Sequence, residues 1–108
     1  MASSSIGYII LTLKAHKEGN QFVSECVELG VASCGETLEV AFENIKDAVT
    51  LYLNTLEKEG ERERVFVERD IQVILGELPK PEPEISVSVR PHEYVSPAMI
   101  RIPILLSV

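Results

Sequence analysis

The sequence is poor in aromatic residues and in cysteine. It contains no tryptophan, three phenylalanines and three tyrosines among 108 residues, so its core must be mostly aliphatic. Two cysteines, Cys26 and Cys34, are too few for a disulfide-stabilised secreted scaffold. No apolar run approaches the length of a membrane span, and Met1–Ser5 lacks the basic and apolar segments of a signal peptide. We therefore expect a cytoplasmic protein with free thiols and no membrane contact.

Basic residues are also scarce relative to acidic ones. Seventeen acidic side chains stand against ten basic ones, which gives a formal net charge of −7. Such a charge repels phosphate backbones, so we expect no direct nucleic-acid binding. The densest basic cluster, Arg62, Arg64 and Arg69, is interleaved with acidic residues and forms no phosphate track. The charge either attracts a basic protein partner or serves only solubility.

The length corresponds to one domain. With 45% hydrophobic and 25% charged residues, the balance is that of a folded globular chain rather than a disordered one. We expect residues 1–6 to form a disordered tail, residues 7–60 to form the main body, and residues 61–108 to extend the same domain.

The first third of the chain has the pattern of three short strands. Ile9, Leu11 and Leu13 alternate along the first, and Gly19-Asn20 lies in the polar turn after it. Short loops between successive strands favour an antiparallel three-stranded meander. The expected strands are Tyr8–Lys14, Phe22–Val27 and Val31–Cys34, with turns over His16–Asn20 and Glu28–Gly30.

A long amphipathic helix follows from Thr37 onward. Apolar residues recur at steps of three and four, which is typical of one buried helix face. Thr37 is the expected N-cap and Gly60 the C-terminal stop. The apolar stripe consists of Leu38, Ala41, Phe42, Ile45, Val49, Tyr52, Leu53 and Leu56.

The remainder of the chain reads as shorter elements separated by prolines. Pro103 places the last strand at a sheet edge or a bulge, because proline has no N–H to donate. The expected elements are a short helix over Arg62–Glu68, a strand over Ile71–Leu75, a stiff connector over Pro79–Pro83, a strand over Ile85–Arg90, a loop over Pro91–Pro97 and a strand over Ala98–Val108. The fold class is therefore α+β: an antiparallel meander packed on one long helix, followed by additional C-terminal strands.

No set of residues has the spacing of an active site. The two histidines, His16 and His92, lie in a turn and a loop, and nothing in the sequence brings them together. The carboxylates are densest over Glu25, Glu28, Glu36, Glu39 and Glu43. Glu39 and Glu43 belong to the solvent face of the helix. We expect no enzyme activity and no cofactor.

Cys26 and Cys34 flank a turn. If that hairpin centres on Gly30, the two thiols face each other and can oxidise or hold a metal together with two further ligands. No further ligand lies nearby in the sequence, and two small core thiols are the simpler interpretation.

We expect the chain to act by binding another protein through a complementary surface. An α+β domain with an edge strand can add a partner's strand, pack against its helix, or associate with a second copy of itself. The expected partner or oligomer interface consists of Tyr94, Val95, Ile100, Ile102 and Ile104. We expect a homo-oligomer.

Several short stretches between Tyr8 and Gly60 form one combined pattern. They are Ser24-Glu25-Cys26, Glu28-Leu29-Gly30-Val31-Ala32-Ser33, Gly35-Glu36-Thr37-Leu38-Glu39, Ala41-Phe42-Glu43-Asn44-Ile45-Lys46-Asp47-Ala48 and Leu51-Tyr52-Leu53. In their order this half of the chain, residues 7–60, resembles the HicB-like antitoxin domain. The resemblance implies a curved three-stranded sheet backed by one helix, assembled as a dimer or tetramer. It implies a partner, the small mRNA-cleaving toxin HicA, whose catalytic face the antitoxin covers.

The sequence departs from that family beyond Pro79. Many HicB proteins carry a C-terminal helix-turn-helix or ribbon-helix-helix module, and both modules need two helices. Here the pattern after Pro79 is one of strands and prolines, so the chain resembles a short, orphan-type member without a DNA-binding module. It is expected either to occlude a HicA-type toxin or to be a self-associating HicB-fold domain without a toxin.

Overall fold

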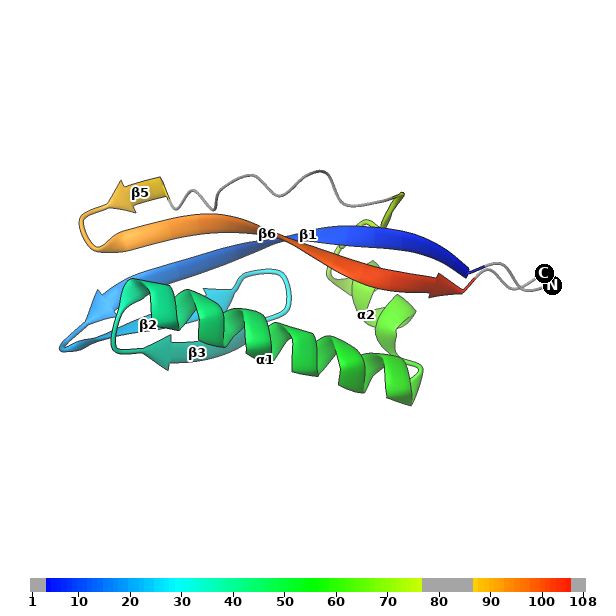
Figure 1. The fold of residues 1–108 in the computed structure, drawn as a ribbon, viewed down its shortest axis with the longest axis horizontal. Coiled ribbons are helices and arrows are strands. Elements are labelled where there is room, and N and C mark those ends of the chain that lie inside the picture. Colours follow the sequence, from blue (N-terminus) through cyan, green and yellow to red (C-terminus); the bar gives the residue numbers. More distant parts are fainter. Residues whose placement is uncertain (1–3, 77–86, 106–108) are drawn as a thin grey trace.

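The protein is an α+β structure in which helices cover one face of an antiparallel sheet (Figure 1). The computed structural model describes residues 4–76 and 87–105. The elements are β1 (Ser4–Glu18), β2 (Gln21–Cys26), β3 (Val31–Gly35), α1 (Leu38–Glu59), α2 (Arg62–Glu68), β4 (Ile74–Leu75), β5 (Val87–Arg90) and β6 (Glu93–Leu105).

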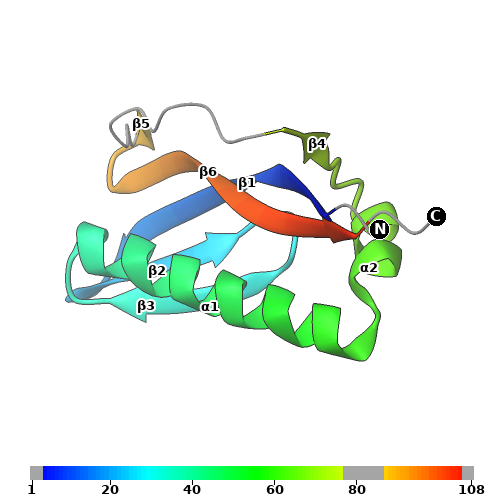
Figure 2. The same cartoon turned by 45° about the vertical axis from the view of Figure 1, so that its right-hand side comes forward.

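The strand order is β3-β2-β1-β6-β5, and β4 pairs with β1. β1, β2 and β3 form the expected antiparallel meander, and β1 and β6 form a long ribbon from Ser4↔Leu105 to His16↔Glu93. Figure 2 shows β4 and α2 at the end of this ribbon where β1 begins and β6 ends. The first and last strands of the described chain are therefore central neighbours in one sheet.

The long helix begins and ends where the sequence predicts. The Thr37 hydroxyl accepts a hydrogen bond from the backbone N–H of Val40 at 3.1 Å, which satisfies one orphan donor of the first turn. Gly60 ends the helix in the left-handed region, at φ 69°, where glycine has no steric penalty. Six of the eight residues of the expected apolar stripe are buried, while Leu38 and Tyr52 are partly buried. The short helix over Arg62–Glu68 is also confirmed.

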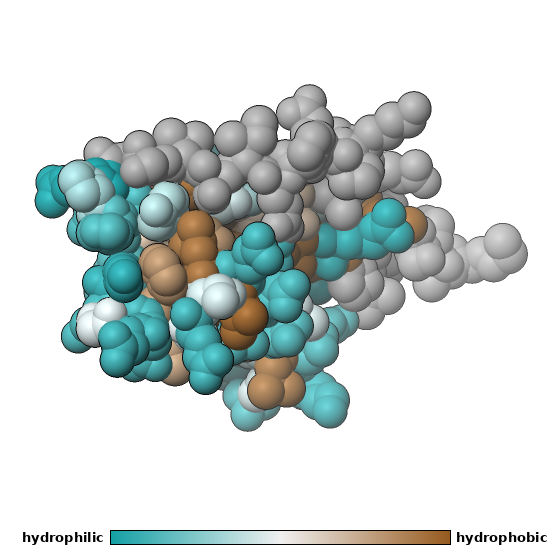
Figure 3. Space-filling view, turned by 60° about the vertical axis from the view of Figure 1, so that its left-hand side comes forward, coloured by the Kyte–Doolittle hydropathy of each residue, from teal (hydrophilic) through white to brown (hydrophobic). Residues whose placement is uncertain are grey.

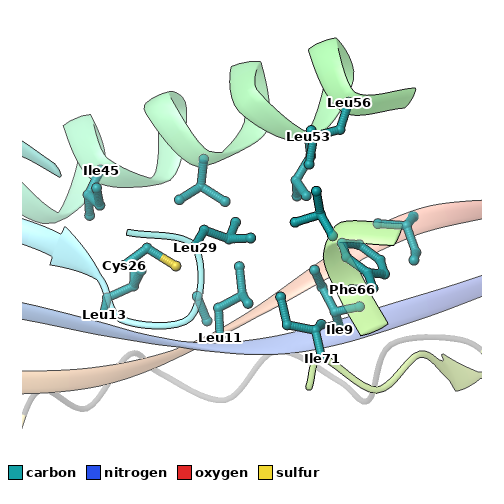
Figure 4. Close-up of a cluster of buried hydrophobic side chains, with 14 of the residues drawn as sticks. Ile9, Leu11, Leu13, Cys26, Leu29, Ile45, Leu53, Leu56, Phe66 and Ile71 are labelled. Carbon is teal, nitrogen blue, oxygen red and sulfur yellow. The ribbon is translucent and has the colours of Figure 1, made fainter. Parts of the chain in front are cut away.

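The core lies between α1, α2 and one face of the sheet (Figure 4). Ile9, Leu11 and Leu13 of β1 are completely buried, and Ile45 of α1 is buried against this layer. Gly35 allows the close approach of the helix to β3, because a Cβ there would lie 2.6 Å from the backbone nitrogen of Ala41. The aliphatic character predicted from the composition is thus the character of the core.

Several boundaries differ from the prediction. β1 begins at Ser4, so residues 4–6 of the expected tail belong to the strand, and it continues to Glu18, so that only Gly19-Asn20 remain in the turn. β4 is confined to Ile74–Leu75, and Ile71, which was expected in the strand, is 8% exposed and belongs to the core. The connector Pro79–Pro83, the first two residues of the strand expected over Ile85–Arg90, and residues 106–108 lie outside the described residues.

The loop expected over Pro91–Pro97 is wrong, since β6 already begins at Glu93. Pro97 is tolerated inside β6 for a geometric reason. It is in register with Thr12, whose N–H and C=O point away from β6, toward Glu28 and Val27. The Pro97 nitrogen therefore faces the outer edge of β6, where β5 pairs only as far as Val95 among the described residues. β6 lies between β1 and β5 in the strand order, so the edge position expected from Pro103 does not hold for the strand as a whole.

Candidate functional site

The sheet has a second face, opposite α1, which we call the open face. Alternation along the ribbon places Ile6, Ile10 and Thr12 of β1 there, and Met99 beside Ile10. Ile6, Ile10 and Met99 are 43%, 48% and 40% exposed, and neither α1 nor α2 packs over them. The open face therefore exposes three apolar side chains among polar ones.

The edge of β1 is interrupted beside this surface. On that edge β2 is in register with β1 only from Leu13 onward, and β4 only at Gly7 and Tyr8. Within the described part of the chain, neither strand has a residue in register with Ile10 there. Since the N–H and C=O of Thr12 point to this edge, those of Ile10, two residues away, point into the same gap.

Glu28, in the turn between β2 and β3, closes one end of the gap. Its carboxylate accepts two hydrogen bonds from Thr12, one from the backbone N–H at 2.7 Å and one from the hydroxyl at 2.8 Å. The side chain therefore takes the place of a strand partner for Thr12. Each carboxylate oxygen keeps a further lone pair for another donor.

The gap holds a depression of about 290 Å³ that we call the notch. Two of its residues, Glu28 and Asp70, are acidic, and none of the lining residues that the structure describes is basic. Asp70 lies in the left-handed region, at φ 56°, just after α2. The lining residues are Ile10, Glu28, Asp70, Ile71, Gln72 and Ile74. No sequence pattern indicates this site, because it joins β1, the β2–β3 turn and the segment after α2.

The residues expected at an interface lie on both faces of β6. Ile102 is 4% exposed in the core, and Ile100 and Tyr94 are partly buried against it. The Tyr94 ring lies 6.5 Å from the ring of Phe22, centroid to centroid. Val95 is half-buried on the open face, and Ile104 is in register with Ser5 near the end of the ribbon. Their role in an interface remains a prediction.

The expectation that Cys26 and Cys34 face each other is wrong. Cys26 is in register with Val31, whereas Cys34 is in register with Val23, so the two thiols are on opposite faces of the sheet. Cys26 is buried and Cys34 is exposed. Burial raises the pKa of the Cys26 thiol above its ordinary value of 9.0, and the charges of Glu28 and Glu25 act in the same direction. The pair cannot form a disulfide or share a metal in this structure.

The two histidines lie closer than the sequence suggests. His16 is in register with Glu93, and the N–H of Lys17 donates to the carbonyl of His92 at 2.9 Å. Both rings are exposed, and His16 Nε2 lies 3.3 Å from a carboxylate oxygen of Glu18. Over residues 4–76 and 87–105, no three His, Cys, Asp or Glu side chains gather in a way that could hold a metal ion.

The polar face of α1 is exposed as expected, at Glu39, Glu43 and Asp47.

Figure 3 shows one end of the molecule, where a narrow band of hydrophobic residues runs between hydrophilic ones. Neither helix of the described ranges combines the length and apolar character needed to cross a lipid bilayer.

Comparisons with protein-family models, with curated proteins and with solved structures give no match for this chain. The open face and the notch therefore stand on their geometry alone.

Proposed function

We propose that the chain is a HicB-like protein-binding domain that binds a small, basic HicA-type toxin and covers its catalytic face in the cytoplasm. The observation that carries this proposal is the order β1–β2–β3–α1, with α1 on one face of the sheet, over the residues Tyr8–Gly60 that resemble the family. The mechanism is steric: the bound chain keeps mRNA from the toxin's active site, and no side chain of the antitoxin reacts.

Two further features support binding rather than DNA recognition. The net charge of −7 attracts a basic protein and accelerates the encounter. After Gly60 the described chain has one seven-residue helix, α2, followed by short and long strands. Helix-turn-helix and ribbon-helix-helix modules need two helices, so the described residues offer no module of that kind for an operator.

Co-expression with a small basic protein encoded next to this gene tests the proposal. We expect the toxin alone to stop growth and degrade mRNA, and the chain to restore both and to co-purify with the toxin in a defined ratio. A folded chain that neither binds nor inhibits such a neighbour would contradict the proposal. Glu43→Ala, on the exposed polar face of α1, is a control variant that should leave the fold and the sheet unchanged.

A second candidate is a self-associating domain without a toxin. The exposed apolar side chains of the open face, Ile6, Ile10 and Met99, favour it. This candidate predicts a dimer or tetramer of the isolated chain in sedimentation experiments, together with no toxin gene nearby. A monomer at high protein concentration would exclude it.

A further inference from the structure

The notch combines an apolar lining with two carboxylates. Ile10, Ile71 and Ile74 supply the apolar walls, and Glu28 and Asp70 supply the negative charge. The nearest basic residue along the chain, Arg69, precedes Asp70 but does not line the notch. A lysine or arginine side chain matches this surface, because its methylene stem packs on apolar groups while its charged end meets carboxylates.

The strand edge at the notch supplies a second kind of contact. The N–H and C=O of Ile10 point into the gap between β2 and β4. An extended partner segment can pair with them as a strand pairs with a sheet edge. The exposed side chain of Ile74 lines the notch and Met99 is in register with Ile10, so apolar neighbours of the basic residue also find a surface.

We propose that the notch binds a lysine or arginine side chain presented by an extended, otherwise apolar segment of a protein partner. The inference rests on the proposed function, since it names the place on this chain where a basic partner docks. Charge complementarity selects this occupant: the net charge of the chain is −7, and both charged residues among the described lining of the notch are acidic.

The test uses the full chain, isotope-labelled for NMR, and an acetylated and amidated pentapeptide with one lysine between two valines. We expect this peptide to shift the amide signals of Ile10, Gln72 and Ile74. The same peptide with norleucine or glutamate in place of lysine should shift them far less. Equal shifts with all three peptides, or none with any, overturn the proposal. Concentration-dependent shifts without peptide assign the notch to a second copy of the chain and overturn it equally.

Matched variants separate charge from fold. Asp70→Asn removes one charge, and asparagine tolerates the left-handed backbone of this position. We expect it to weaken lysine-peptide binding about two- to fivefold, the size of an exposed ion pair. Asp47→Asn, on the exposed face of α1, is the control with the same charge change and should leave binding unchanged.

Gln72 gives a charge swap in an exposed segment outside the helices and strands. Gln72→Lys should abolish peptide binding, and Gln72→Glu should strengthen it. Equal binding by both variants overturns the proposal. If the lysine peptide discriminates as expected but no toxin binds, the proposed function fails and the notch remains a cation site. If a toxin binds and all notch variants bind it equally, the notch proposal fails and the function stands.

Discussion

The two faces of the sheet lie in opposite environments. Ile9 and Ile10 are neighbours in β1, yet Ile9 is completely buried under the helices whereas Ile10 is 48% exposed. The covered face of β1 is apolar at Ile9, Leu11 and Leu13, whereas the open face mixes Ile6, Tyr8 and Ile10 with Thr12, Lys14 and His16, so alternation indicates which face is covered. The helix agrees with this pattern: α1 covers the face of Ile9, Leu11 and Leu13 and leaves Ile10 exposed. Residue type alone does not distinguish Ile9 from Ile10. The alternation of their neighbours and the position of α1 determine which of the two is buried.

The sharpest test of this comparison is a pair of alanine substitutions. Ile9→Ala should lower the free energy of unfolding by about 2–5 kcal/mol, because it opens a cavity in the core. Ile10→Ala should cost less than about 1 kcal/mol, because half of the side chain is already in water. Urea denaturation of both variants measures the difference. Equal losses would mean that the open face is covered in solution.

The contact between α1 and β3 provides the next test. Gly35→Ala should cost about 1–3 kcal/mol, as overpacking does, because the new methyl group meets the backbone of Ala41 and Val40. Thermal unfolding measures the loss. Adding Val40→Ala should not restore stability, since the closest atom belongs to the Ala41 backbone. Full recovery in the double variant would place the clash in the side chain alone.

On the open face, the hydrogen bonds between Glu28 and Thr12 are expected to matter less than the core. Glu28→Gln should cost about 1–2 kcal/mol, because one of the two acceptor oxygens is replaced by a donor and the charge is lost. Glu25→Gln, in the exposed part of β2, is the control and should be nearly neutral. Denaturant unfolding that gives equal values for the two variants would show that Glu28 does not support the strand.

The two cysteines compare the faces with one residue type. Cys34 should react with a thiol reagent in the native chain, whereas Cys26 should react only after unfolding. The pKa of Cys26 is raised in the folded state. Its contribution to the free energy of unfolding is therefore complete below pH 9.0 and is lost as pH rises through the pKa of the folded state. Stability should therefore fall above pH 9, and the Cys26→Ala variant should fall less steeply. Two rapidly reacting thiols in the native chain would contradict this assignment.

The smallest expected effect is a gain in stability, whereas the other substitutions lower it. Ser24 is buried on the helix-covered face, and its hydroxyl has no hydrogen-bond partner among the described residues. Ser24→Ala removes that unsatisfied group and should raise stability by up to about 1 kcal/mol. A loss of more than that amount in calorimetry would show that a partner for the hydroxyl exists in solution.

The sequence predicts those parts of the fold that local patterns control. The helix over Leu38–Glu59 follows from its apolar spacing and from the caps Thr37 and Gly60. Pro97 predicts a loop where β6 has already begun, because the sequence does not show that the proline nitrogen faces outward and leaves the ladder with β1 intact. The notch could not be predicted, since Ile10 and Asp70 are brought together only by the path of the chain from α2 to β4.

The pairing of β1 with β6 also sets the order in which the chain can fold. Ile9 is in register with Ile100, so the central ribbon closes only after β6 has left the ribosome, and contacts so distant in sequence form slowly. β1, β2, β3 and α1 come from adjacent segments and have no such delay. During synthesis, the edge of β1 meant for β6 stays unpaired, and the core lacks Ala98 and Ile102. We expect the nascent chain to be most prone to aggregation, and most dependent on chaperones, in that interval.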